Sequence, residues 1–599
     1  MEKTYIYNKV KVGSRAFRVI ITSLLLTTSL TSCLDTIILP DDKTVDEDFW
    51  QTKEDVSSMV NAAYQGMVGE DVIEQLLVWA SRSDELVLGT ESSGAYTDAL
   101  EEMAAVNMQV TNRYAKWSSL YSVINRCNIV LERAEAVMSV DPSYTQGDYM
   151  VDRAHMLALR SLCYFYLVRN FRDVPYTGTA YMNSSQEMQL PQSSPAYVLE
   201  QCIQDLEWAV QYAVSPRSYG TGEWRRVGWL TQDGIRALLA DIYLWRASVT
   251  HSQSDYQRCV EYCDQVIASK QAQHVKGRNE VEEKLYPLAS AEDAYTALFV
   301  DQNAEESIFE LQSRANNALC RYYYKWSAST SFRSSSTEGY LRAAAIFDPG
   351  KAASNVTAVG TSQVFSTNDL RLYGAVFAGS DESFHVRKMI SNQSVTAKTA
   401  QSRDNQMWTT LGLNQNLIIY RLTDVMLMRA EALVQLANPS DESDTYLQQA
   451  FTMVQAVNSR ALYRDNQADS MQWTKTYRAY TKDQMELLVM QERLRELCFE
   501  GKRWYDLLRY NYRHVEGVDY NRTFAEQMDA NENFQPVANY ADMLSLMTRS
   551  RGTDGPAIQA KMRNEAYLYL PVPNSDIIVC PLLRQNPAYK SSNQYEKTY

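Results

Sequence analysis

Apolar residues recur at steps of three and four over most of this chain, which is the spacing of one face of a helix. The pattern is plainest late in the sequence, where one face is formed by Leu487, Met490, Leu494, Leu497, Gly501, Tyr505 and Leu508. Thr481 stands before this stretch and Gln484 three residues later, so their side chains can cap the first turn. Gly501 either lets another backbone approach or divides the helix in two. We expect this stretch to hold the fold together.

The other faces of this late stretch are dense with charge. Charged side chains occur at Glu492, Arg493, Arg495, Glu496, Glu500, Lys502, Arg503, Asp506 and Arg509. Glu500 and Arg503, like Lys502 and Asp506, stand one turn apart and can pair along the helix surface. A catalytic use of the carboxylates is the alternative. We interpret the charges as structural pairs, because that is the usual role of this spacing on a helix.

The late stretch also carries a resemblance. Residues 492–509 read Glu-Arg-Leu-Arg-Glu-Leu-Cys-Phe-Glu-Gly-Lys-Arg-Trp-Tyr-Asp-Leu-Leu-Arg, which resembles the signature segment of the SusD/RagB family of outer-membrane nutrient-binding lipoproteins. Three other segments are similar to that family: residues 48–64, residues 160–175 and residues 567–589. The second of these departs from the family in placing Arg172 where a glycine commonly stands.

The first part of the chain continues the helical pattern. Thr52 stands before a helix that runs to Tyr64, with acidic residues in its first turn. Residues 79–85 run from a helix end into a loop. Arg113 to Ala136 follows as a long amphipathic helix.

Three later helices look like one another. Tyr166-Leu-Val-Arg169, Tyr243-Leu-Trp-Arg246 and Met426-Leu-Met-Arg429 take similar places in helices rich in Ala and Leu. Each helix is followed by a second one, over 195–213, 255–269 and 444–461. Helix pairs that cannot bury their own apolar faces must stack, as in tetratricopeptide arrays. The expected fold is therefore mostly α, a tetratricopeptide-like array of helix pairs with large irregular loop-rich inserts. The resemblance implies four such pairs.

The first residues read as an export signal. A basic start is followed by the apolar run from Val19 to Leu30, which is shorter than the roughly 20 residues that span a bilayer. The run ends in Leu30-Thr31-Ser32-Cys33, which resembles a bacterial lipobox. We expect lipidation of Cys33, whose acyl chains would hold the protein at a membrane. An ordinary secretion signal with a chance cysteine is the alternative.

The same patterns divide the chain into segments. Between about 271 and 415 the helical period fades, and aromatic residues are embedded among Ser, Thr, Asn and Gly. Such irregular stretches usually serve function rather than packing. Residues 33–599 are expected to form one globular unit. Its segments are a lipidated tether (33–45) after the signal peptide (1–32), a helical region (46–270), an irregular ligand-facing insert (271–415), a second helical region (416–510) and a loop-rich C-terminal segment (511–599).

Composition narrows the function. The chain has 599 residues with a formal net charge of −14 and no basic patch, which argues against nucleic acid as a partner. Its 40 tyrosines suit both cores and polar binding surfaces. The five histidines are scattered and the nine cysteines complete no zinc spacing, so neither a metal nor a cofactor is expected. The cysteines other than Cys33 are interpreted as small buried residues, with disulfides left open.

The resemblance implies a function. Family members sit on the outer face of the outer membrane over a SusC-like TonB-dependent transporter, and they pass bound glycans inward without chemistry. Sugars pack C–H faces on aromatic rings and bond their hydroxyls to planar polar groups, so aromatic residues beside Asp or Arg are suitable ligands. For each aromatic candidate, the alternative is that it packs in the core. The candidate ligand-binding residues are Trp79, Arg82, Asp84, Tyr96, Tyr322, Trp326 and Trp408.

Three alternative functions follow from other interpretations of the sequence. Capture of peptides, as in the RagB branch, would use the same architecture. A helical-repeat adaptor that binds only protein is the second alternative. A glycosidase or peptidase is the third, but no Gly-x-Ser-x-Gly, His-Glu-x-x-His or phosphate-binding glycine loop occurs, so we expect no enzyme.

Overall fold

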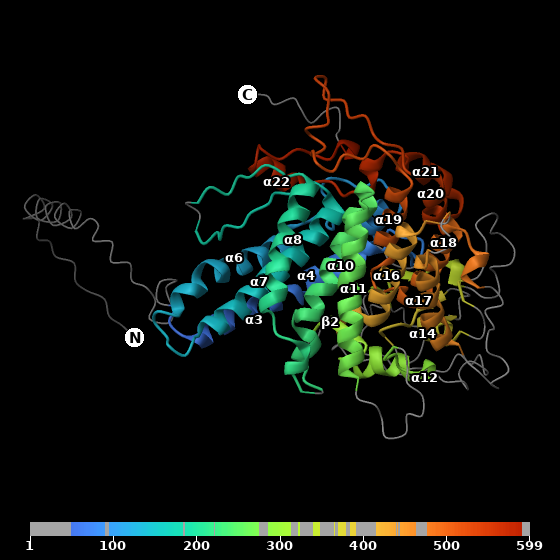
Figure 1. Ribbon diagram of the computed structural model, residues 1–599. Coiled ribbons are helices and arrows are strands. Elements are labelled where there is room, and N and C mark those ends of the chain that lie inside the picture. Colours follow the sequence, from blue (N-terminus) through green and yellow to red (C-terminus); the bar gives the residue numbers. More distant parts are fainter. Residues whose placement is uncertain are drawn as a thin grey trace, which may run out of the picture. The chain divides into compact units, whose positions relative to one another are not determined.

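Figure 1 shows the computed structural model of the chain, which divides into two units, residues 1–51 and residues 52–599. In the first unit only residues 49–51 are described, and there the rings of Phe49 and Trp50 meet edge to face at 5.4 Å. The predicted export signal, the tether and Cys33 lie outside the described residues. The described ranges are 49–89, 95–183, 186–220, 222–274, 286–312, 322–323, 339–347, 364–365, 369–378, 384–390, 415–438, 440, 444–462 and 476–589.

The second unit is built from stacked helix pairs, which appear side by side in Figure 1. The pairs are α3 (Lys53–Met67) with α6 (Ser118–Val137), α7 (Gln146–Phe171) with α8 (Pro195–Tyr212), α10 (Gln232–Thr250) with α11 (Gln253–Gln273), and α16 (Leu422–Leu436) with α17 (Tyr446–Ala461). Contacts of α6 with α7, α8 with α10 and α11 with α16 join each pair to the next. The predicted tetratricopeptide-like fold class is confirmed, although the helix expected from Arg113 begins at Ser118.

Several helices begin at caps that the sequence supplies. Thr52 accepts a hydrogen bond from the Asp55 amide while the Asp55 carboxylate accepts one from the Thr52 amide, and Thr145 and Asp148 form the same reciprocal box before α7. From residue 154 to its end, α7 is buried on every side, because α6 and α8 both pack against it. Buried polar residues on this helix must therefore find partners inside the protein.

Helix α7 ends at Arg172, which has the left-handed φ of +65° that glycine adopts most easily. This is the position where the resemblance places a glycine. The Arg172 side chain is fully buried and pairs with Asp173 at 2.6 Å. It also donates to the carbonyls of Asp519 and Arg522, so it ties the end of α7 to the C-terminal segment.

The late stretch is two helices rather than one. Helix α18 (Lys482–Leu497) starts at the predicted Thr481–Gln484 capping box, and α19 (Arg503–Arg513) follows after a turn. Gly501 takes a φ of +75° in this turn, which a residue with a side chain adopts only at a cost. Gly501 therefore divides the helix, one of the two outcomes expected for it. On the predicted apolar face, Leu497 is buried and Leu487 is half-buried.

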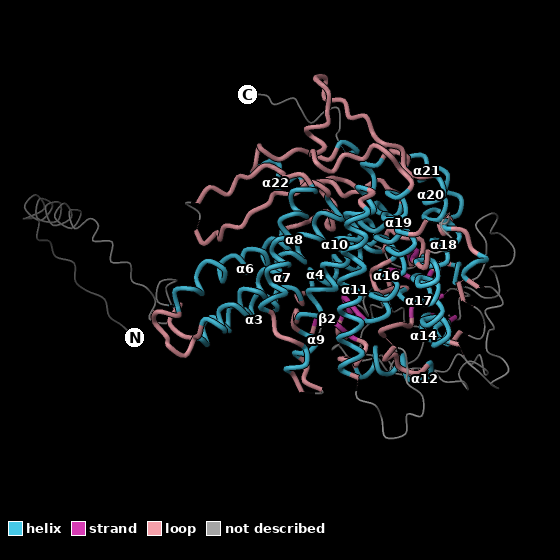
Figure 2. The backbone as a smooth tube through the Cα atoms, in the orientation of Figure 1, coloured by secondary structure: helices cyan, strands magenta, loops and turns pink. Residues whose placement is uncertain are grey.

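Shorter elements cover the stack, and Figure 2 shows that strands are few among the described residues. The helical ones are α4 (Glu70–Ala80), α5 (Ala95–Ala104), η1 (Pro216–Ser218), α9 (Arg225–Gly228), α12 (Ala291–Tyr295), η2 (Thr296–Asp301), η3 (Ala345–Phe347), α14 (Leu370–Ala375), η5 (Tyr477–Ala479), α20 (Ala541–Thr548), η6 (Gly552–Asp554), α21 (Gly555–Met562), η7 (Glu565–Leu568), α22 (Asn574–Val579) and η8 (Pro587–Tyr589). Three antiparallel two-stranded sheets pair β1 (Leu86–Leu88) with β3 (Leu341–Ala343), β2 (Ser307–Leu311) with β6 (Leu417–Arg421), and β4 (Val376–Ala378) with β5 (Phe384–Val386).

Two properties bear on function. No helix in the described ranges is both long and apolar enough to cross a membrane, and no cluster of potential metal ligands occurs there. Among the cysteines that the structure describes, none forms a disulfide, six are buried and Cys580 is half-buried. Cys320 lies outside the described residues.

Candidate functional site

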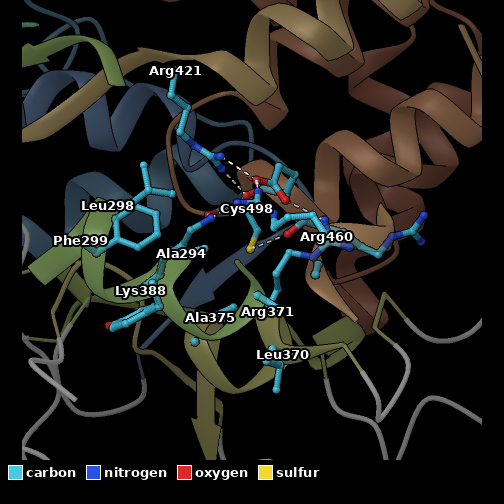
Figure 3. Close-up of a pocket in the computed structure, with 16 residues that line it drawn as sticks. Ala294, Leu298, Phe299, Leu370, Arg371, Ala375, Lys388, Arg421, Arg460 and Cys498 are labelled. Carbon is cyan, nitrogen blue, oxygen red and sulfur yellow. Dashed lines mark hydrogen bonds and ion pairs between the residues drawn. The ribbon is translucent and has the colours of Figure 1, made fainter. Parts of the chain in front are cut away.

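A cavity lies between α12, η2, α14 and α18 (Figure 3). Leu298 and Phe299 form its apolar wall on one side, and Arg371 and Arg460 approach from the other. The space that the centre of a water molecule can reach inside it measures about 50 Å³. One water needs roughly 10–15 Å³ by this measure, so the cavity has room for a few waters and not for a sugar ring.

The charged residues at this cavity form ion pairs with one another. Glu496 binds Arg421 at 2.6 Å and Arg371 at 2.8 Å, and it also contacts Arg460. Glu500 binds Lys388 at 2.6 Å. Burial by itself would raise the pKa of Glu496, but the three guanidinium groups more than offset this and hold its pKa well below the usual value. The carboxylate stays ionised, so it is poorly suited to donate a proton.

These contacts correct the expectation of pairing along the helix surface. Glu500 and Arg503 do not pair with each other: Glu500 binds Arg421 and Lys388, whereas Arg503 binds Asp84. Lys502 reaches Asp424 on α16 at 2.8 Å rather than Asp506. Most charges of the late stretch are buried and bind other elements, because α18 and α19 are covered on the faces that a surface helix exposes. Two pairs do form one turn apart within a helix, Glu492 with Arg495 at 2.8 Å and Asp506 with Arg509 at 2.7 Å. These charges therefore have the structural role that was predicted, and they also link α18 and α19 to other elements of the fold.

The first three candidate residues lie on α4 and the loop after it, and two of them are buried. Trp79 is fully buried, and its indole N–H donates to the Tyr114 carbonyl at 2.9 Å. Asp84 is also fully buried and binds Arg503 at 2.8 Å and Arg549 at 2.5 Å. Arg82 is half-buried with its guanidinium 4.2 Å from the ring centre of Trp504. As placed here, Trp79 and Asp84 serve the core and present no surface to a ligand.

The other candidates divide differently. Tyr96 is half-buried at the start of α5, and Tyr322 is fully buried. Trp326 and Trp408 lie outside the described residues. Tyr96 is therefore the candidate aromatic that combines a described position with an accessible surface.

Tyr96 stands in a group of side chains that we call the Tyr96 cluster. Its members are Tyr96, Arg113, Tyr114, Tyr322 and Tyr340. The Tyr96 and Tyr340 rings stack at 5.4 Å with 11° between their planes, and the exposed Arg113 guanidinium lies 3.7 Å from the Tyr96 ring centre. Beneath them the Tyr322 ring contacts Tyr340 at 5.7 Å, and its hydroxyl bonds that of Tyr114 at 2.5 Å.

Burial keeps Tyr114 and Tyr322 neutral. Burial raises the pKa of Tyr114 to about 12, and burial together with the neighbouring Tyr114 raises that of Tyr322 further. The Tyr114–Tyr322 hydrogen bond is thus present in its neutral form at physiological pH. This hydrogen bond fixes two rings beneath Tyr96 and Tyr340, so the half-buried Tyr96 is supported by a rigid base.

The β1–β3 sheet brings the cluster together. Leu88 pairs with Leu341, and the Gly89 amide extends the ladder by donating to the Tyr340 carbonyl at 2.8 Å. A Cβ on Gly89 would lie 2.4 Å from the Gly339 carbonyl oxygen, so only glycine fits this approach. The pairing places Tyr340 next to Tyr96, although the two residues are 244 positions apart in the sequence.

The half-buried Tyr96 beside the exposed Arg113 can contact a flat ligand, whereas Tyr340 is buried. Tyr340 and Arg113 cover the two faces of the Tyr96 ring, so a ligand would meet the accessible edge of the ring and the guanidinium, which donates to hydroxyl or carbonyl oxygens and is held in place by the cation–π contact. Arg113 and Tyr340 are not among the residues predicted for the site. The periodic pattern predicts Arg113 within a helix, and Tyr340 is one of several aromatics in the irregular insert. The strand pairing places Tyr340 beside Tyr96, and the loop before α6 brings Arg113 there.

Comparisons with known proteins agree with this architecture. A family model described as SusD family matches residues 265–589, and one described as starch-binding associating with outer membrane matches residues 39–244. SusD-like protein P38 of Formosa agariphila is 22% identical over 502 residues, covering 80% of this chain and 89% of that protein. SusD-like protein P2 of the same organism is 22% identical over 508 residues, covering 82% and 90%.

Solved structures are similar in fold. A SusD homolog from Bacteroides thetaiotaomicron has a TM-score of 0.65 at 16% identity and covers 91% of this chain and 99% of its own. A laminarin-binding SusD-like protein has a TM-score of 0.58 at 18% identity and covers 90% of this chain and all of its own. The fold is that of a helical-repeat protein with short strands. The chain belongs to the SusD family, as the four resembling segments predicted.

Proposed function

We propose that this protein binds oligosaccharides at the Tyr96 cluster and delivers them to a SusC-like TonB-dependent transporter of the outer membrane. The observation that carries the proposal is the half-buried Tyr96 ring with the exposed Arg113 guanidinium on it, supported by the buried Tyr340. A sugar ring needs apolar area and nearby hydrogen-bond donors, and Tyr96 and Arg113 offer both.

Two comparisons support glycans rather than peptides. One matching family model is described as starch-binding, and one structure with the same fold is that of a laminarin-binding protein. Peptide capture of the RagB kind and an adaptor without a small ligand remain the alternative functions. Trp326 and Trp408, which lie outside the described residues, are proposed as further ligand contacts.

The protein is proposed to act without catalysis. In the described residues the carboxylates of the signature segment are held by arginine and lysine, and Glu496 is kept ionised by three guanidinium groups. A glycosidase needs one carboxyl group that holds a proton near neutral pH. The carboxylates of the cavity in Figure 3 are set up for pairing instead.

Binding is tested by calorimetric titration of the full-length protein against a panel of neutral and acidic glycans and a panel of peptides. Tyr96→Ala should weaken glycan binding by roughly fivefold or more, since loss of one ring contact costs about 1 kcal/mol. The melting temperature should change little, because Tyr96 is only half-buried. Tyr197→Ala, at a tyrosine on α8 that is 50% exposed, is the matched control and should leave binding unchanged.

Other results of this experiment would favour one of the alternative functions. Binding of peptides alone, weakened by Tyr96→Ala, would replace glycan capture with peptide capture. A protein that binds neither panel yet co-purifies with the transporter would be an adaptor. Product release from any glycan would overturn the absence of catalysis.

We also propose that Cys33 carries a lipid anchor that holds the protein on the cell exterior. The motive is the basic start, the short apolar run and Leu30-Thr31-Ser32-Cys33. Cys33→Ala removes the thiol that would take the lipid, so the protein should move from the membrane to the soluble fraction. Ser32→Ala keeps the thiol and should leave the protein at the membrane. If Cys33→Ala partitions like the wild type, the anchor is not at this residue.

A further inference from the structure

Two arginines near the Tyr96 cluster have no carboxylate partner among the residues that the structure describes. Arg82 donates to the carbonyls of Trp79 and Leu568 at 3.0 Å each and to the Asn170 side chain at 2.5 Å. Arg551 has one contact, to the Ser83 carbonyl at 3.4 Å. A guanidinium has five N–H donors, so two remain on Arg82 and four on Arg551.

This arrangement differs from that of the other buried arginines. Arg169 binds Asp241, Arg503 binds Asp84, and Arg509 binds Glu431, each within 3.3 Å. The carboxylate beside Arg551 is Asp84, which Arg503 and Arg549 already bind. Within the described part of the chain, the positive charges of Arg82 and Arg551 are therefore not balanced by a directly bound carboxylate.

Both arginines line the same two small hollows. One hollow is walled by Met103, Met108, Met547, Met562, Trp504 and Tyr567, and the other by Leu88, Leu100, Met103 and Leu341. Apart from the two arginines these walls are largely apolar, which strengthens the attraction between a guanidinium and an anion. Burial lowers the pKa of Arg82 to about 10 and lowers that of Arg551, and both groups still carry charge at neutral pH.

The size of the hollows limits what enters them. Space for water centres measures about 20 Å³ in the first hollow and about 10 Å³ in the second, which is room for one or two waters. One or two terminal oxygens of a carboxylate or sulfate group fit in this space, whereas a sugar ring does not. The ring would stay outside while its charged substituent reaches the arginines.

Helix α5 connects the hollows with the Tyr96 cluster. Tyr96, Leu100 and Met103 recur at steps of four and three and so share one face of the helix. At 1.5 Å per residue, Tyr96 and Met103 lie about 10 Å apart along the axis. Tyr340 and Leu341 are neighbours on the paired strand, and Leu341 lines the second hollow. One oligosaccharide can therefore contact both the Tyr96 cluster and the two arginines.

We propose that Arg82 and Arg551 form a subsite for the anionic substituent of an acidic glycan, a carboxylate or a sulfate. The inference rests on the proposed function, and it names the ligand as an acidic rather than a neutral oligosaccharide. Guanidinium groups bind both anions with paired hydrogen bonds, so the chemistry is shared and the experiment separates the two.

The test measures calorimetric binding of the full-length protein to four probes. These are an oligogalacturonate, the same oligosaccharide as its methyl ester, a sulfated galactan oligosaccharide and a tetraglutamate peptide. The acid or the sulfated probe should bind at least tenfold more tightly than the ester. Arg551→Met should remove that difference, and Arg551→Lys should keep part of it. Arg563→Met removes one exposed arginine from the end of α21 and should keep the difference in full.

Melting curves establish that each variant is folded before binding is compared. A preference for the acid supports a carboxylate, and a preference for the sulfated probe supports a sulfate. Equal binding of the acid, the ester and the sulfated probe would overturn the subsite while leaving glycan capture intact, and so would a preference that survives Arg551→Met. Binding of tetraglutamate alone would overturn both the subsite and the proposed glycan function.

Discussion

Arg503 binds Asp84 through two hydrogen bonds of 2.8 and 3.0 Å, although 419 residues separate them in the chain. Arg503 belongs to the signature segment, and Asp84 immediately precedes Glu85 and the strand β1. The same strand pairs with β3 and positions Tyr340 in the Tyr96 cluster. The signature segment therefore supports the candidate ligand site through Asp84 and β1.

Asp84→Asn should destabilise the protein rather than change its specificity. Arg503 and Arg549 would lose their buried partner, which typically costs about 3–5 kcal/mol. The measurement is the free energy of unfolding in urea, with the exposed Asp98→Asn as control. Should Asp84→Asn abolish glycan binding with unchanged stability, Asp84 would belong to the ligand site as the sequence suggested.

Gly89→Ala should disturb the Tyr96 cluster through the backbone. The added Cβ would stand 2.4 Å from the Gly339 carbonyl oxygen, so β1 and β3 must separate and Tyr340 must move. We expect a loss of about 1–3 kcal/mol in stability and weaker glycan binding. Gly220→Ala, where the structure leaves open space, is the control. Unchanged binding in the Gly89 variant would show that Tyr340 is not needed for the site.

Glu85→Gln should change how stability depends on pH. Burial raises the pKa of Glu85 to about 8, against a usual value of 4.5, while the Phe499 amide offsets part of the shift. Between these values the folded protein keeps a proton that the unfolded chain has lost, so stability falls as pH rises. The contribution is full below pH 4.5 and lost by pH 8. Glutamine stays neutral, so the free energy of unfolding of the variant should gain about 1–4 kcal/mol relative to wild type from pH 5 to 8.

Urea unfolding at several pH values measures this difference. Glu54→Gln, on the exposed side of α3, provides the control for a change in net charge. A difference between Glu85→Gln and wild type that stays constant from pH 5 to 8 would mean that Glu85 is already ionised in the folded protein.

Arg172→Gly tests the departure from the family pattern. Glycine would relieve the left-handed φ of +65°, which costs another residue about 1–2 kcal/mol. It would also leave Asp173 without its guanidinium, a larger loss of about 3–5 kcal/mol. The variant should therefore be less stable by about 2 kcal/mol in urea unfolding, and adding Asp173→Asn should recover part of the loss. A gain in stability would mean that backbone strain outweighs the ion pair.

The sequence by itself determined that the fold is mostly an array of helix pairs and where several of the helices begin. The capping boxes at Thr52 and Thr481 were readable because a cap depends on residues three apart, and the amphipathic pairs were readable because helical periodicity is local. Because these signals are local, they do not predict features that depend on distant residues. Gly501 was compatible with a continuous helix or a break, and only its surroundings decide between them.

Tertiary structure decided which charged and aromatic residues meet. Asp84 and Trp79 looked like ligand residues, but the packing of α4 against α6 and α19 buries them. Tyr340 reaches Tyr96 only because β1 pairs with β3 across more than 200 residues, and Arg113 reaches it because the loop before α6 folds back on α5. A side chain's partners and its access to solvent depend on contacts far apart in sequence. Periodicity within one helix or strand carries no record of such contacts.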